Sequence, residues 1–134
     1  MYILKIIKRV AITLSAFTFA VMISSSNAYA NDVKIIMITH GTASDEFWAP
    51  VKKGAEDAAV DVRVTLSYQA PEAGTDMVAM TDLIRSAINQ EVDGIIITVP
   101  DVNALGGPIS EAADAGIPVV TINSGTDTLN QTKA

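Results

Sequence analysis

The sequence predicts an α/β fold, an open parallel sheet with helices on both faces. Short runs of β-forming residues alternate with longer segments in which apolar residues recur every three or four positions. Helical crossovers of this length join parallel strands, and right-handed crossovers can place helices on both sides of the sheet. The first strand, 33–39, is almost continuously apolar, as expected for a strand that is covered on both faces.

The first helix is expected after the loop that follows this strand. Its apolar positions are three or four residues apart and form one stripe: Val51, Gly54, Ala55, Ala58 and Val62. The helix is therefore expected to begin near Val51. Because proline inside a helix loses a hydrogen bond and clashes with the preceding turn, Pro50 is placed in the first turn, with Asp45 or Glu46 as the cap.

The second strand is expected at 62–68. It alternates apolar and polar residues, which is typical of a strand near a sheet edge. A loop at 70–75, which contains Pro71 and Gly74, separates it from the second helix. The buried stripe of that helix consists of Met77, Met80, Ile84, Ala87 and Ile88.

The third strand is expected at 95–99, where Pro100 ends it. Residues 101–103 can cap a third helix, and Gly116 stands where a helix C-terminus favours a left-handed residue. The apolar positions of this helix include Leu105, Ile109, Ala112 and Ala113. A fourth strand at 118–122 completes the order βαβαβαβ.

Residues 1–30 are expected to be a secretory signal peptide. A basic start at 5–9 is followed by an apolar run at 10–23 and by small residues that end in Ala28-Tyr29-Ala30, an A-x-A cleavage pattern. The apolar run is shorter than the roughly 20 residues that a membrane span needs. An uncleaved membrane anchor is the alternative.

Cleavage after Ala30 would leave one domain of 104 residues, 31–134. Three of the nine basic residues lie in the signal, so six remain against 15 acidic ones, a net charge of −9. Such acidity argues against binding to nucleic acid. Without cysteine there is no disulfide, no zinc site built on thiolates and no cysteine-linked lipid anchor. We therefore expect a protein that is free in the periplasm.

The carboxyl ends of the strands are the expected binding site, because open parallel sheets bind ligands there. Phe47 and Trp48 are two of only three aromatic residues after residue 30. Carboxylates and amides beside aromatic faces suit a sugar, which has hydroxyls around its edge and apolar C–H faces. The candidate ligand-binding residues are Ser44, Asp45, Phe47, Trp48, Asp101, Asn123 and Ser124. The alternative is that the polar residues form caps and turns, and that the aromatics hold the helix to the core.

Motifs for catalysis or cofactor binding are not found in the sequence. Gly41 stands alone after the first strand, without a glycine-rich dinucleotide fingerprint or a phosphate-binding loop. His40 is the only histidine, so a histidine metal cluster is excluded. We expect no enzyme, catalytic residue, metal or cofactor. An alternative from another class is a small secreted α/β enzyme that uses His40 with Asp45 or Ser44.

In order and spacing, five segments resemble the periplasmic sugar-binding proteins of the ribose- and galactose-binding type. These proteins are substrate-binding components of ABC importers and have the periplasmic binding protein-like I fold. The segments are Ser44-Asp45-Glu46-Phe47-Trp48, Val51-Lys52-Lys53-Gly54-Ala55-Glu56, Asp93-Gly94-Ile95-Ile96-Ile97, Pro100-Asp101-Val102-Asn103-Ala104-Leu105, and 115–123.

The resemblance implies roles for particular residues. In that family two aromatics after the first strand sandwich the sugar ring, and a polar residue just before them binds its hydroxyls. These roles would fall on Phe47, Trp48 and Asp45. The ribose-type members carry an Asp-Arg pair after the fourth strand, where this chain has Asn123 and Ser124. The ligand is therefore left open between another sugar, a polyol and a different small polar metabolite.

The family fold has two similar lobes that close on a ligand between them. By resemblance, residues 31–134 supply most of the first lobe only, so we expect the isolated chain to bind its ligand weakly or not at all. The implied partners are a sugar-like ligand and an ABC permease in the inner membrane, with the protein acting as a monomer. The alternative in the same fold is a periplasmic sensor that presents its ligand to a chemoreceptor or a histidine kinase.

Overall fold

The computed structural model describes residues 33–42 and 45–125. These residues form a four-stranded sheet in the order β2-β1-β3-β4, with every neighbouring pair parallel. The strands are β1 (Lys34–Ile38), β2 (Thr65–Gln69), β3 (Gly94–Ile97) and β4 (Val119–Thr121); the helices are α2 (Trp48–Val62), α3 (Met77–Asn89) and α4 (Val102–Asp114). The predicted fold class is confirmed. The expected signal peptide lies outside the described residues.

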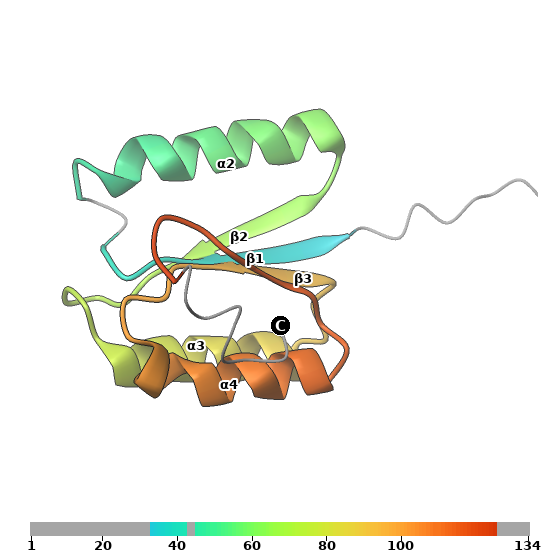
Figure 1. Cartoon of the computed structure of the whole chain (residues 1–134). Helices are drawn as coiled ribbons and strands as arrows, with labels where there is room; N and C mark the ends of the chain where they lie inside the picture. Colours follow the sequence, from blue (N-terminus) through green and yellow to red (C-terminus); the bar gives the residue numbers. More distant parts are fainter. Residues whose placement is uncertain (1–32, 43–44, 126–134) are drawn as a thin grey trace, which may run out of the picture. The chain divides into compact units, whose positions relative to one another are not determined.

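The helices form two layers on opposite faces of the sheet (Figure 1). α2 covers one face, and α3 and α4 lie side by side on the other. The chain moves from β1 to β2 in one direction and from β2 to β3 in the other, so right-handed crossovers place the helices on opposite faces. The strand order therefore reverses between β1 and β3. The carboxyl ends of these two strands flank the point where open α/β sheets bind ligands.

The main hydrophobic core lies between the sheet and the layer of α3 and α4. It is built from alternate strand residues and from the inward stripes of both helices. Its fully buried members include Ile36, Ile38, Met80, Ile84, Leu105 and Ile109. β2 lies at the edge of the sheet, as its alternating sequence predicts, and its side chains are half-buried or exposed. The central strands β1 and β3 supply most of the buried strand residues.

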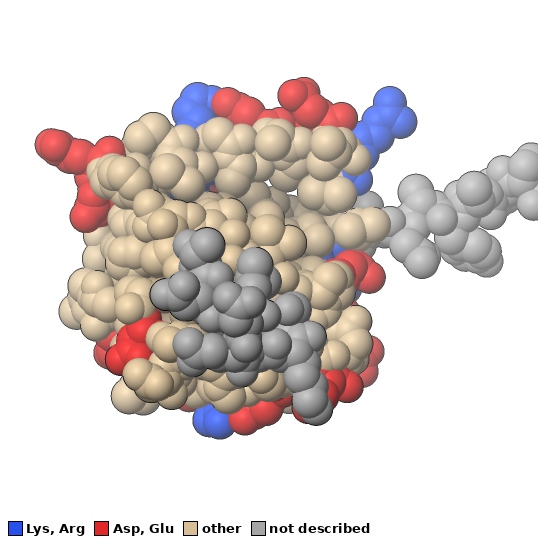
Figure 2. Space-filling view, viewed as in Figure 1, with Lys and Arg blue, Asp and Glu red and all other residues tan. Residues whose placement is uncertain are grey.

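The opposite face of the sheet is covered less completely. Met37 of β1 and Ala59 of α2 are buried, but Val120 of β4 is 56% exposed. An open groove of about 400 Å³ lies between α2 and the amino-terminal halves of the strands, with apolar residues such as Ile35 and Ile96 in its lining. In Figure 2 the part of the surface between α2 and the other two helices that grey atoms do not cover is largely uncharged. This groove lies away from the carboxyl ends of the strands.

The starts of α2 and β2 each differ by about three residues from the expected positions, and the third strand, expected to end at residue 99, ends at Ile97. α2 begins at Trp48, before the expected start near Val51, and its N-cap residue is Phe47 in place of Asp45 or Glu46. Pro50 does lie in the first turn, where its missing N–H costs no helical hydrogen bond. The helix starts earlier because the indole of Trp48 is buried and anchors its first turn.

The boundary between α2 and β2 is also shifted. Val62, expected to begin the second strand, is the last residue of α2. Arg63 then takes a left-handed conformation with φ of 60°, and its N–H donates to the carbonyls of Ala59 and Val60. Residues other than glycine rarely adopt this conformation, so the end of the helix at Arg63 could not be predicted from the residue type.

Other predicted ends are confirmed. Asp101, one of the residues predicted to cap the third helix, is the N-cap residue of α4. Asp76, which was not predicted as a cap, is the N-cap residue of α3. Gly116 follows α4 with a φ of 82°, and its N–H donates to the carbonyl of Ala113. The left-handed conformation explains the choice of glycine at this position, since a Cβ would be strained there.

Ion pairs lie on the exposed outer faces of the helices. On α2, Lys53 Nζ lies 2.7 and 2.9 Å from the two oxygens of Asp57, and this hydrogen bond and charge raise the pKa of Lys53. Between α3 and α4, the guanidinium of Arg85 donates to both oxygens of Glu111, which raises the pKa of Arg85. Within the described part of the chain, no helix combines the length and apolar character needed to cross a membrane.

Candidate ligand-binding site

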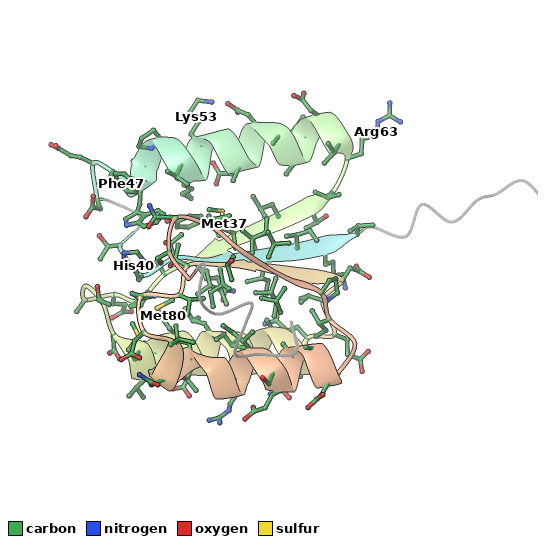
Figure 3. The ribbon with its side chains drawn as sticks, in the orientation of Figure 1. Met37, His40, Phe47, Lys53, Arg63 and Met80 are labelled. Carbon is green, nitrogen blue, oxygen red and sulfur yellow. The ribbon has the colours of Figure 1, made fainter. Side chains whose placement is uncertain are left out.

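The loop from β1 to α2 brings several candidate residues to the carboxyl edge of the sheet. In Figure 3, His40 and Phe47 lie at this end of the molecule, and Arg63 lies at the other. Asp101 follows β3, and Asn123 and Ser124 follow β4, so their backbones reach the same edge. The candidate Ser44 lies outside the described residues.

Asp45 holds the loop against the start of α2. Its Oδ1 accepts a hydrogen bond of 2.8 Å from the backbone N–H of Phe47, and its carbonyl accepts one of 2.9 Å from Ala49. Its own N–H donates to the carbonyl of Thr42. The side chain is exposed, and its hydrogen bond to Phe47 uses one carboxylate oxygen. Asp45 therefore fixes the backbone of Phe47 while its carboxylate stays accessible to a polar ligand.

The two neighbouring aromatics have different environments. Phe47 is 56% exposed, whereas Trp48 is only 4% exposed. Their rings meet edge to face, with centroids 4.9 Å apart and planes at 83°. The indole also meets the imidazole of His40 edge to face, with centroids 5.1 Å apart and planes at 81°. Phe47 thus presents an open apolar surface, and Trp48 supports it from behind.

A buried polar layer under the loop was missed by the sequence reasoning. Thr98 Oγ1 lies 2.9 Å from both the backbone nitrogen and Nδ1 of His40. Thr39 Oγ1 lies 2.6 Å from the hydroxyl of Tyr68 and 3.2 Å from the carbonyl of Gly41. The two threonines are fully buried. One signal could have found them, since each directly follows an apolar run of a predicted strand, Thr39 after 35–38 and Thr98 after 95–97.

Asp101 is the N-cap of α4. Its Oδ1 accepts from the backbone N–H groups of Asn103 and Ala104 at 2.9 and 3.2 Å. This is the capping role that the sequence offered as the alternative to ligand binding. Both capping bonds go to Oδ1, and the residue is exposed. The cap therefore leaves the second oxygen for another donor.

The turn after β4 presents Asn123 and Ser124. Asn123 is exposed and has a φ of 61°, a conformation that asparagine tolerates better than most residues. The carbonyl of Ser124 accepts from the N–H of Val99, which joins the ends of β4 and β3. Within residues 33–42 and 45–125, Ser124 Oγ is buried and has no hydrogen-bond partner. A buried hydroxyl without a partner is costly, and a ligand hydroxyl could satisfy it.

These residues offer the chemistry of polyol recognition. One exposed aromatic ring lies at an edge that also carries carboxylates, an amide and a hydroxyl. Carboxylate oxygens accept from ligand hydroxyls, and an aromatic face packs on C–H groups. In the described residues, no three His, Asp or Glu side chains are grouped so that they could hold a metal ion.

Comparison with known proteins places the chain in a family. A family model described as the periplasmic binding protein domain matches residues 35–133. The chain therefore belongs to the periplasmic binding protein domain family, and the resemblance inferred from the five sequence segments is confirmed. The parallel sheet with two helical layers matches the fold of the solved relatives.

Several relatives are named for sugars. The xylose/arabinose-binding protein of Sulfolobus acidocaldarius is 32% identical over 91 residues, which are 68% of this chain and 22% of that protein. The crystal structure of a carbohydrate transporter from Acidothermus cellulolyticus 11B in complex with myo-inositol is 42% identical, with a TM-score of 0.69 over 76% of this chain and 35% of that one.

An arabinose-binding protein from Geobacillus stearothermophilus has a TM-score of 0.67 and is 29% identical, over 77% of this chain and 34% of that chain. The chain thus spans 22% to 35% of the length of these relatives.

Proposed function

We propose that the protein is the substrate-binding component of an ABC-type importer and binds a sugar or a sugar-like polyol in the periplasm. In this proposal residues 1–30 are a cleavable signal peptide, and residues 31–134 belong to the first lobe of the binding protein. The ligand passes to a permease in the inner membrane, and the binding protein acts as a monomer. No cofactor takes part.

The exposed ring of Phe47 is the observation that supports this proposal most. A phenyl ring that is 56% exposed beside carboxylates at the carboxyl edge of the sheet can pack against the C–H face of a sugar. Asp45 is two residues away and fixes the backbone of Phe47 through its carboxylate. Asp45 is proposed to accept hydrogen bonds from the hydroxyls of a sugar whose C–H face packs on Phe47. Trp48 packs against the Phe47 ring and supports it, so that Asp45, Phe47 and Trp48 form one wall of the proposed site.

Polar groups from the other strand ends complete the proposed wall. The second oxygen of Asp101 is proposed to accept from a ligand hydroxyl, since the helix cap occupies only Oδ1. Ser124 Oγ, which is buried without a partner among the described residues, is proposed to bind a hydroxyl that reaches the turn after β4. Asn123 would contribute its amide, and Ser44 is proposed to contact the same ligand.

The relatives favour sugars and cyclic polyols as the ligand class. One is named for xylose and arabinose, and the structure at 42% identity holds myo-inositol. They also favour import over sensing, because the solved structure that holds myo-inositol is described as a carbohydrate transporter. His40 bonds to Thr98 and packs on Trp48, which supports a structural role for it more than a catalytic one.

One lobe offers a ligand a single wall. Binding to this chain alone is therefore expected to be weak, with a dissociation constant of about 1 mM or higher, because only one face of the sugar is desolvated. NMR titration of the isotopically labelled chain is the suitable measurement, since it detects weak binding residue by residue. The probes are myo-inositol, xylose, arabinose and D-allose, each added in turn.

We expect at least one probe to shift the Phe47 amide and the Trp48 indole N–H signals. Phe47→Ala should abolish these shifts. Val60→Ala is the matched control, because Val60 is a 77% exposed apolar residue of the same helix but is not part of the proposed wall. If none of the probes shifts either signal, or if Phe47→Ala responds like the unchanged protein, the site is wrong. A sub-micromolar affinity would refute the single-wall argument.

A further inference from the structure

The indole of Trp48 occupies the space that a side chain at position 41 would need. A Cβ placed on Gly41 would lie 2.0 Å from Nε1 and 2.1 Å from Cδ1 of Trp48. Neighbouring atoms of real side chains do not approach this closely, so even a methyl group would displace the indole. The burial of Trp48, which is 4% exposed, therefore depends on a glycine seven residues earlier.

The backbone gives no other reason for glycine at this position. Gly74 and Gly116 have φ values of 54° and 82°, where residues with a Cβ are strained. Gly41 is not among the residues with positive φ. An alanine could adopt its backbone conformation, and only the indole opposes it.

His40 forms the second support of the indole and is itself held by the sheet. The backbone N–H of His40 donates to Thr98 Oγ1, which leaves the hydroxyl hydrogen of Thr98 free to donate to Nδ1. Two bonds from one buried threonine thus fix both the backbone and the ring of His40. The ring meets the indole edge to face at 5.1 Å. Such aromatic pairs favour this geometry.

A continuous chain of contacts connects the buried sheet with the exposed ring. Thr98 holds His40, His40 and Gly41 seat Trp48, and Trp48 meets Phe47 edge to face at 4.9 Å. Phe47 precedes α2 as its N-cap residue, without a side-chain cap bond of its own. Its ring therefore depends on the indole for support.

The geometry points to Gly41 and His40 as positioning residues of the ligand site: they seat Trp48 so that Phe47 faces the ligand. This inference rests on the proposed function of Phe47 as the stacking surface. Neither residue needs to touch the ligand. Gly41 would tune the site through the position of the indole, so a larger residue at 41 would move the aromatic wall.

The chain contains a single tryptophan, so its fluorescence reports directly on the packing and solvent exposure of the Trp48 indole. In the full chain, Gly41→Ala should shift the emission of Trp48 to longer wavelength and increase its quenching by acrylamide several-fold. Gly54→Ala is the matched control. Gly54 lies in α2, and a Cβ there would meet no atom within 4 Å, so its spectrum should stay that of the unchanged protein.

The effect of Gly41→Ala on binding is measured by NMR titration with the probe that shifts the Phe47 amide signal most. Gly41→Ala should weaken its binding about tenfold, which corresponds to the loss of one aromatic contact. An unchanged emission spectrum overturns the positioning role. If Gly41→Ala changes the Trp48 emission but not the affinity for the probe, the positioning role is also overturned, and the proposed function stands. If no probe binds any variant, the proposed function fails, and the fluorescence arm still decides whether Gly41 seats Trp48.

Should Gly41→Ala fail to fold, the same substitution is made together with Trp48→Leu, which removes the opposing ring. Folding of the double variant, followed by circular dichroism, would confirm that the indole alone excludes a side chain at 41. If Trp48→Leu folds and the double variant does not, glycine is needed for another reason and the inference is wrong.

Discussion

Asp76 and Asp101 cap the two helices of one layer in the same manner. Oδ1 of Asp76 accepts from the N–H groups two and three residues on, at 2.9 and 3.0 Å. Oδ1 of Asp101 does the same at 2.9 and 3.2 Å. Only Asp101 is a proposed ligand-binding residue. Comparing substitutions at the two residues therefore distinguishes the structural role of a capping aspartate from the proposed role of Asp101 in ligand binding.

We expect Asp76→Ala and Asp101→Ala each to lower the free energy of unfolding by about 1 kcal/mol, the usual loss for an N-cap aspartate. Urea denaturation followed by circular dichroism measures this. Only Asp101→Ala should also reduce the NMR shifts caused by the probe ligand. Asp101→Ser, which keeps a capping oxygen, should restore stability but not binding. Equal effects of the two alanine variants on binding would remove Asp101 from the site.

Thr98→Val tests the buried support under the loop. Valine has nearly the same shape but no hydroxyl, so the N–H and Nδ1 of His40 would both lose their partner. We expect a loss of about 1–3 kcal/mol in the free energy of unfolding, because Thr98 is fully buried and water cannot replace the bonds. Thr98→Ser keeps the hydroxyl and should retain most of the stability. Denaturation of the two variants side by side is the measurement, and a larger loss for Thr98→Ser than for Thr98→Val would show that packing, not hydrogen bonding, is the role of Thr98.

Gly116→Ala should destabilise the protein by about 1–2 kcal/mol, since the left-handed conformation after α4 brings a Cβ too close to the following carbonyl. Nothing lies within 4 Å of the added Cβ, so any loss comes from the backbone and not from a clash. Gly54→Ala has equally open space but a helical backbone, and should be neutral or stabilising by up to about 1 kcal/mol. Thermal unfolding of both variants checks the prediction, which fails if the two substitutions have the same effect.

Local patterns were sufficient for the order of the elements. The apolar runs, the helical spacing of Met80, Ile84 and Ala87, and the stop at Gly116 each depend on residues that are close in the sequence. The end of α2 was placed wrongly because Arg63, not glycine, takes the left-handed conformation. A valine such as Val62 fits the end of a helix or the start of a strand, and the sequence alone favoured the strand.

The sequence by itself determined the parallel α/β class, the family resemblance and the loop that pairs Phe47 with Trp48. Only the tertiary structure decided that Phe47 is exposed and Trp48 is buried. The physical reason is that burial here depends on contacts between distant segments: Thr98 lies 58 residues after the histidine that it holds, and this histidine packs on the indole. Periodicity describes which residues share a face of one element. It carries no information about which side chain from another strand will fill the space behind them.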